Sequence, residues 1–204
     1  MIVCKSSSEV DRMRTANQLV ADVLCELKTM VEPGMTTNQL DTVAETRIRA
    51  VGAKPAFKGY QGYPSTICAS VNDAVVHGIP SDEVLKDGDI ISLDIGVVLD
   101  GYYGDSAVTI GVGSVSERAS KLMTVTSEAL ERAIAKVQVD GRLSDIGHAV
   151  QQHVEAFGFS VVREFVGHGI GTQLHEEPQI PNYGEPGRGP RLLEGMVLAI
   201  EPMV

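Results

Sequence analysis

The chain has 204 residues, 43% of them hydrophobic, which is enough for one domain, or for two closely fused halves, with a sizeable core. Its 17 Lys and Arg residues stand against 27 Asp and Glu residues, and the formal net charge of -10 without a basic cluster argues against a nucleic-acid ligand. No apolar run reaches the roughly 18 residues of a membrane span, and residues 1–9 lack the apolar stretch of a signal peptide, so we expect a cytoplasmic protein that does not bind membranes.

Two helices are predicted in the first quarter of the chain. Apolar residues recur at helical spacing over Ser8–Val31. Thr36 and Gln39 have the spacing of a capping box, which predicts a second helix that ends at Gly52. Residues 53–64 are rich in Gly, Pro and Tyr and are expected to form a loop.

Three strands are predicted next. Apolar-rich segments cover Thr66–Val71, Ile90–Leu99 and Tyr102–Ile110. Asp100 and Gly101 separate the second segment from the third, and this dipeptide is a strong signal for a two-residue hairpin turn. The last two segments should therefore pair as an antiparallel hairpin.

The pattern then restarts in the second half of the chain. Helices are predicted over Ser114–Val137 and Ser144–Phe157, and strands over Phe159–Val166 and Val197–Ile200. His148 and His153, on the second of these helices, are expected to face solvent and to have no catalytic role.

Three pairs of residues repeat at a spacing of 107 positions. They are Gly34 and Gly141, Gly88 and Gly195, and Asp94 and Glu201. The spacing favours an α+β fold made of two duplicated helix-helix-strand halves, about 8–112 and 113–204, around a central, mostly antiparallel sheet. The whole chain, 1–204, is then one domain, although chance similarity between two α/β segments is an alternative explanation.

Two carboxylates should converge on the predicted hairpin. If Asp100 and Gly101 form the turn, Asp94 lies opposite Ala107 and Asp105 lies opposite Gly96, so the two acids are diagonal neighbours about 7 Å apart at the backbone. In an apolar strand pair they would repel each other unless a cation lay between them or one bound a proton. The alternative is that both point into solvent.

His168 and Glu201 are further candidate metal ligands. His168 lies in a glycine cluster, residues 167–171, which should allow close approach of backbone and leave the imidazole uncovered. A dinucleotide-binding loop is excluded there, because Pro178 and Pro181 leave no room for the helix it requires. Glu201 ends an apolar strand and needs a partner. Carboxylates and an imidazole together suit Mn, Fe, Co or Zn, although a lone histidine is more often structural. His77, before a predicted turn, is as well explained as a core histidine.

Four motifs together resemble the type I methionine aminopeptidases, which share the pita-bread fold of creatinase and the proline-specific aminopeptidases. The motifs are GYQGYPSTICASVNDAVVHGIP (59–80), LDIGVVLDGYYGDSA (93–107), GHGIGTQLHEEPQIPNYG (167–184) and LEGMVLAIEP (193–202). The resemblance extends over the whole chain. His168 and Glu201 are only 33 residues apart, which leaves no room for the insertion of type II members.

The resemblance implies a role for each matching residue. Two divalent ions, Co, Mn, Fe or Zn, would be bound by Asp94, Asp105, His168 and Glu201, with Asp105 bridging and Glu201 also relaying protons. His77 and His175 would contact the scissile peptide, and Tyr60, Tyr63 and Cys68 would line the methionine pocket. Leu174 departs from the family's usual Phe in that pocket.

The activity implied is removal of the N-terminal methionine from nascent proteins and peptides with a small second residue, by water activated between the two metals. The enzyme would act in the cytoplasm, with nascent chains at the ribosome as partners, and would be a monomer. Two alternatives stay open: a non-catalytic binding module of the same fold, and a hydrolase of X-Pro peptides or a creatinase-like substrate.

In the family a second Glu, on the strand after the one carrying Glu201, also bridges both metals. The sequence stops at Val204, before such a strand. The repeat leads to the same expectation, because Asp105 should have a counterpart beyond residue 204. We therefore expect that a few tens of residues are missing and that this chain lacks a fifth ligand.

Overall fold

The computed structural model describes residues 1–204, which divide into two compact units. The N-unit consists of Asp11–Glu117 with Gly171–Leu174, and the C-unit consists of Met1–Val10, Arg118–Ile170 and His175–Val204. None of the helices combines the length and apolar character needed to cross a membrane.

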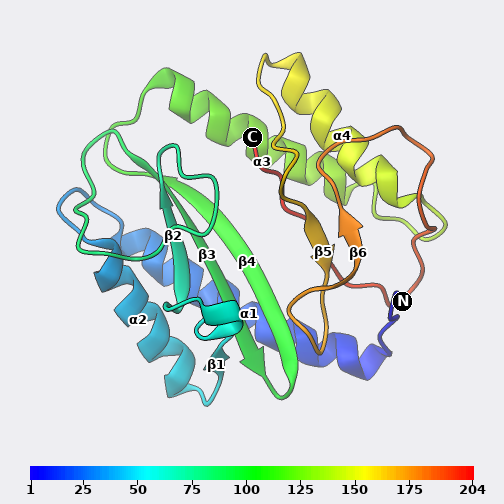
Figure 1. Cartoon of the computed structure of the whole chain (residues 1–204), viewed down its shortest axis with the longest axis horizontal. Helices are drawn as coiled ribbons and strands as arrows, with labels where there is room; N and C mark the ends of the chain where they lie inside the picture. The colour runs from blue at the N-terminus through cyan, green and yellow to red at the C-terminus, as the bar shows by residue number, and fades with distance from the viewer. The chain divides into compact units, whose positions relative to one another are not determined.

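The N-unit contains one antiparallel sheet and its helices (Figure 1). The helices are α1 (Ser7–Met30, in this unit from Asp11 onward) and α2 (Thr37–Ala50), and the strands are β1 (Lys54–Pro55), β2 (Ile67–Val71), β3 (Ile90–Leu99) and β4 (Tyr102–Gly111). Strand β3 pairs with all three others. The capping box at the start of α2 is confirmed, since Thr36 and Gln39 bond reciprocally there.

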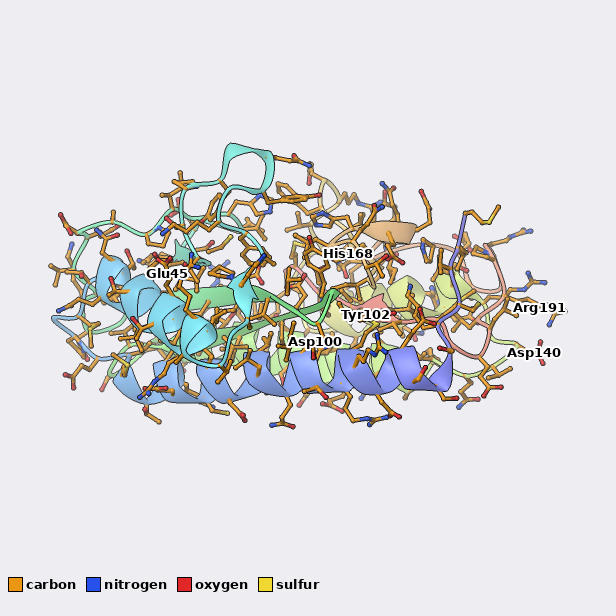
Figure 2. The ribbon with its side chains drawn as sticks, turned by 90° about the horizontal axis from the view of Figure 1, so that it is seen from below. Glu45, Asp100, Tyr102, Asp140, His168 and Arg191 are labelled. Atoms are coloured by element: carbon orange, nitrogen blue, oxygen red, sulfur yellow. The ribbon has the colours of Figure 1, made fainter.

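The predicted hairpin register is confirmed. Leu99 lies opposite Tyr102, and the turn residues Asp100 and Gly101 have φ angles of 50° and 82°, the left-handed region that this tight turn requires. Figure 2 labels Asp100 at the turn and Tyr102 at the start of β4. The register places the predicted acids in fixed positions along the ribbon.

One face of β3 forms the core of the N-unit. Ile91, Leu93, Ile95 and Val97 alternate along the strand and are fully buried against residues of α1 and α2. Strand β4 approaches α1 closely at Gly104, where a Cβ atom would lie 2.8 Å from the backbone of Ala16. The opposite face of β3 carries Ser92 and Asp94. On α2, Glu45, which Figure 2 labels, forms a surface ion pair with Arg49.

The segment predicted as a loop, residues 53–64, contains regular structure. Its β1 residues pair with Val97 and Val98, and a 3-10 turn covers Tyr60–Gly62. Two residues are too few to show a strand periodicity in the sequence, which explains why β1 was missed.

The C-unit contains two helices and a three-stranded antiparallel sheet. The helices are α3 (Glu117–Ile134, in this unit from Arg118) and α4 (Leu143–Ala156), and the strands β5 (Gly167–Gly169), β6 (Glu176–Ile180) and β7 (Leu198–Ala199) run in the order β6-β5-β7. Its core includes Val125 and Ala129 of α3, Ile146 and Val150 of α4, and Ile180 of β6.

Two predictions for the C-unit are wrong. Phe159–Val166 is not a strand, and the ladder begins at Gly167; within that segment the Phe159 N–H donates to the Val154 carbonyl and the Val162 N–H to the Met203 carbonyl. His153 does not face solvent. It is buried, with Nε2 2.9 Å from a carboxylate oxygen of Glu128 on α3. This partner offsets the cost of burying the polar ring.

The buried face of β3 should dominate the stability of the N-unit. We expect Leu93→Ala to lower the free energy of unfolding by about 2–5 kcal/mol, because a fully buried leucine is replaced by a cavity. Urea titration followed by circular dichroism measures the change. The matched control is Leu193→Ala, since Leu193 is 50% exposed and should change the midpoint little. Equal effects of the two substitutions would contradict the packing described here.

Candidate metal centre and substrate site

Asp94 and Asp105 occupy the polar face of the β3–β4 ribbon in the N-unit. Asp94 lies opposite Ala107 and Asp105 opposite Gly96, as predicted, and both carboxylates are half-buried rather than fully in solvent. On its other side Asp94 faces Cys68 of β2. The backbone N–H of Asp105 donates to the side-chain oxygen of Asn17 on α1, at 3.2 Å. The hairpin therefore presents two acids on one face, with the backbone of one tied to a helix.

Tyr63 and Cys68 are neutral groups beside these acids. The Tyr63 hydroxyl lies 3.0 Å from the Ile67 carbonyl oxygen and 2.9 Å from that of Gly78. Burial raises the pKa of the Tyr63 phenol above its ordinary value. Burial, with smaller effects from Asp94 and Asp105, raises the pKa of the Cys68 thiol to about 12. Both side chains are therefore uncharged at neutral pH.

His77 lies in an exposed, strained position. Its φ is 60°, in the left-handed region that non-glycine residues rarely adopt, and its side chain is exposed. The interpretation of His77 as a core histidine is therefore wrong. The next residue, Gly78, approaches β2 so closely that a Cβ atom would lie 2.3 Å from the Ala69 carbonyl oxygen. This contact fixes the backbone that carries the imidazole.

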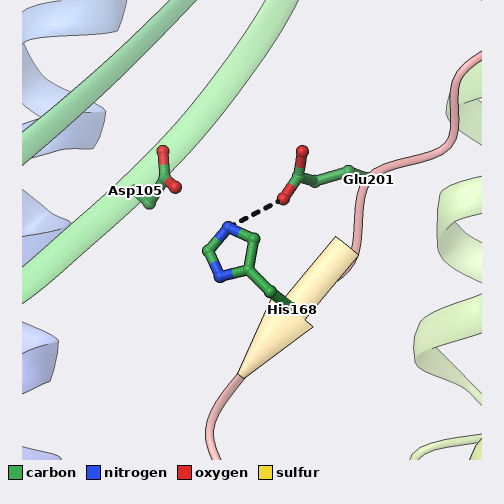
Figure 3. A group of neighbouring side chains, drawn as sticks. All are labelled: Asp105, His168 and Glu201. Atoms are coloured by element: carbon green, nitrogen blue, oxygen red, sulfur yellow. Dashed lines mark ion pairs between the residues drawn. The ribbon is translucent and has the colours of Figure 1, made fainter. Parts of the chain in front are cut away.

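In the C-unit, His168 is held in one tautomer. Its Nδ1 lies 2.9 Å from the carbonyl oxygen of Gly169, which can only accept, so Nδ1 carries the proton of the neutral ring. Nε2 then has a lone pair and lies 3.1 Å from Oε1 of Glu201 (Figure 3). Oε1 is buried and accepts no hydrogen bond, despite this short distance. When the ring is neutral, Nε2 and Oε1 are therefore two electron-rich atoms that face each other.

This arrangement fits a divalent metal ion. An imidazole nitrogen and a carboxylate oxygen that bind one divalent metal lie a few Å apart with no proton between them, and His168 Nε2 and Glu201 Oε1 have that separation. The same contact without a cation would require a doubly protonated imidazole. Asp105, His168 and Glu201 each offer a ligand atom of the type that binds such metals.

The glycines on either side of His168 allow neighbouring strands to approach its backbone. A Cβ atom at Gly167 would lie 2.3 Å from the Ala199 carbonyl oxygen, and one at Gly169 would lie 2.3 Å from the Glu177 carbonyl oxygen. Close approach was predicted correctly. The expectation of an uncovered imidazole is wrong, because His168 is buried; it also lies within β5 rather than after a strand.

His175 is exposed and lies beside His168. The two ring centroids are 4.4 Å apart and the planes meet at 69°. The next residue, Glu176, forms an ion pair with Lys5. Sequence reasoning missed both Lys5 and Asn17, because neither lies in a motif and only the tertiary contact distinguishes them from surface residues.

The comparisons with known proteins assign this chain to a family. The model of metallopeptidase family M24 matches residues 11–204. The chain belongs to this family. Methionine aminopeptidase 1 of Bacillus subtilis is 55% identical to this M24 chain over 204 residues, covering 100% of the chain and 82% of that protein. The relative is thus the longer of the two.

Solved structures give the same result. The crystal structure of methionine aminopeptidase from Rickettsia prowazekii superposes with a TM-score of 0.98 and 41% identity, covering 99% of this chain and 82% of that one. Prolidase from Pyrococcus furiosus superposes at 0.86 with 24% identity, covering 98% and 57%, and shows the fold alone. The architecture is the α+β pita-bread fold, as predicted, and family membership implies divalent metal cofactors.

The burial of Cys68 predicts selective thiol chemistry. At pH 8 we expect an exposed-thiol reagent such as Ellman's reagent to modify Cys4 and Cys25 rapidly, because both are exposed. Cys68 should react only after unfolding in urea, since its pKa of about 12 keeps it protonated and its side chain is buried. The absorbance time course separates the fast reaction of Cys4 and Cys25 from the slow reaction of Cys68. The control variant Cys68→Ala should lack the slow reaction. Three equal rates in the native protein would contradict the prediction.

Proposed function

We propose that this M24 chain is a metal-dependent methionine aminopeptidase, which removes the N-terminal methionine from nascent proteins and peptides with a small second residue. The observation that carries the proposal is the pair of His168 Nε2 and Glu201 Oε1, which lie 3.1 Å apart at a buried carboxylate oxygen. The pair belongs to a chain that is 55% identical, over its whole length, to a protein named methionine aminopeptidase.

The proposed ligands are Asp94, Asp105, His168 and Glu201, which would hold two divalent ions, Co, Mn, Fe or Zn. Two carboxylates presented on one face of the hairpin, and an imidazole and a third carboxylate in the C-unit, supply the donor types that these metals take. When bound, such ions lower the pKa of water to near neutrality and polarise the peptide carbonyl.

The chain's own residues would complete the chemistry. A carboxylate oxygen of Glu201 would take a proton from the attacking water and return it to the departing amine. His175, exposed beside the buried His168, would donate a hydrogen bond to the developing oxyanion. His77, whose exposed ring is held by a strained backbone, would contact the scissile peptide from the N-unit.

The proposed methionine pocket is lined by Tyr60, Tyr63 and Cys68. Because Tyr63 and Cys68 are both neutral at physiological pH, they offer the uncharged, polarisable surroundings that a thioether prefers over a charged side chain. Leu174 is buried and supplies aliphatic rather than aromatic surface. The proposed place of action is the cytoplasm, on nascent chains at the ribosome, as a monomer.

The two alternative functions have less support. The four candidate ligands are all present, whereas a non-catalytic binding module has no need to keep them. An X-Pro hydrolase is represented by the prolidase of Pyrococcus furiosus, which shares the fold at only 24% identity. A peptide panel separates the substrates directly.

Activity should depend on Asp105. Protein expressed from its complete coding sequence and supplied with Mn²⁺ or Co²⁺ should release methionine from Met-Ala and Met-Gly peptides, but not from peptides with a large second residue or from X-Pro peptides. We expect Asp105→Ala to reduce kcat/KM by at least 10³-fold, because loss of a bridging carboxylate leaves metal charge uncompensated. Methionine release, measured by chromatography, gives kcat/KM for the wild-type protein and for Asp105→Ala. Near-normal turnover by Asp105→Ala would refute the ligand assignment.

Metal binding should depend on His168 independently of turnover. Calorimetric titration of metal-free protein with Mn²⁺ should give a dissociation constant at least tenfold weaker for His168→Ala, since the variant loses the only nitrogen ligand proposed. The matched control is His148→Ala in the same unit, whose ring lies 3.0 Å from the Gly184 carbonyl oxygen and has no proposed role. Unaltered Mn²⁺ affinity in His168→Ala would remove His168 from the ligand set.

A further inference from the structure

The C-unit contains a buried ion pair outside the proposed ligand set. Lys5 Nζ donates to Oε2 of Glu176 at 2.6 Å, and the side chains are 5% and 11% exposed. Nζ also donates to the Val3 carbonyl at 3.1 Å, and the Lys5 backbone N–H donates to the Gly195 carbonyl at 2.7 Å. The N-terminal segment, Met1–Lys5, is therefore tied to the C-unit at two points.

Such a pair requires a physical explanation. Lysine is seldom buried, because removing its charge from water costs several kcal/mol unless a well-placed partner compensates. Terminal segments usually remain loosely attached. A leucine or methionine at position 5 would hold the segment with less desolvation, so burial alone does not account for a charge here.

The partner carboxylate lies in β6, the strand that begins directly after His175 and pairs with the strand of His168. Glu176 directly follows His175 and is the ladder partner of Gly169. The Gly169 carbonyl is the acceptor that fixes the His168 ring. The register shifts between His168 and Gly169, so the ladder is irregular at this point. Glu176 therefore lies at the irregular point of the ladder, opposite the residue whose carbonyl accepts from His168.

We propose that Lys5 is a positioning residue: through its ion pair with Glu176 it sets the backbone that carries His175 and supports the His168 acceptor. This role rests on the proposed function for its catalytic consequence. Its effect on His168 is independent of that function, because the Nδ1 hydrogen bond exists whichever substrate is bound.

The central test compares Lys5→Met with Lys5→Arg in metal-loaded protein at 25 °C. Met keeps most of the side-chain volume and removes the charge, whereas Arg keeps the charge. We expect Lys5→Met to lower kcat for a Met-Ala peptide about tenfold to a hundredfold, with KM within twofold, because misplacing His175 affects the transition state more than substrate binding. Lys5→Arg should recover most of kcat. The control is Lys136→Met, an exposed lysine of the same unit.

A double variant separates positioning from stability. Lys5→Met alone leaves Glu176 buried without its cation, which lowers the unfolding midpoint; Lys5→Met combined with Glu176→Met removes both charges and should restore the midpoint. If the pair positions His175, kcat of the folded double variant stays low. Recovery of kcat together with stability would overturn the proposal, as would a folded Lys5→Met protein with normal kcat.

A second measurement does not depend on aminopeptidase activity. In metal-free protein, long-range ¹H–¹⁵N spectra of the imidazoles should show the His168 Nδ1 protonated and hydrogen-bonded in the wild type. In Lys5→Met this Nδ1–H hydrogen bond should weaken, and an unchanged His168 Nδ1 signal overturns the link to His168. If wild-type protein fails to cleave methionyl peptides while this spectral change occurs, the proposed function fails and the positioning role of Lys5 stands.

Discussion

The orientation of one imidazole, that of His168, is the constraint on which the rest of the site depends. A single hydrogen bond from Nδ1 to the neighbouring carbonyl determines which nitrogen keeps a lone pair. With the proton on Nδ1, Nε2 faces Glu201 with a lone pair, and the short contact between them is the position that we propose for a cation. The surrounding features, two glycines without side chains and strands on both sides of β5, serve to hold this one ring in place.

The two units contribute different chemistry. The N-unit offers rigid carboxylates, since Asp94 and Asp105 lie on a ribbon whose other face is buried against two helices. The C-unit offers an imidazole and a carboxylate on short strands that are regular over only a few residues. Long strands fix position by their own ladders, whereas short ones need additional contacts, and Lys5 and Glu176 supply such a contact.

The features that could be predicted from sequence were those set by local rules. Asp100 and Gly101 determine the hairpin, and the register of Asp94 and Asp105 follows from counting outward from the turn. The capping box at Thr36 is equally local. The errors lie where distant contacts decide: His153 is buried because Glu128 lies on another helix, and β5 starts at Gly167 because β6 and β7 pair with it there. No local pattern distinguishes Lys5 from a solvated lysine.

The pairing of Lys5 with Glu176 also has a temporal consequence. The two residues are separated by 171 positions, so during synthesis the lysine leaves the ribosome long before its carboxylate exists. Closing a loop of this length costs conformational entropy. Until it closes, the strand that begins directly after His175 lacks this ion pair. A nascent chain that has not yet reached Glu176 would therefore lack this ion pair.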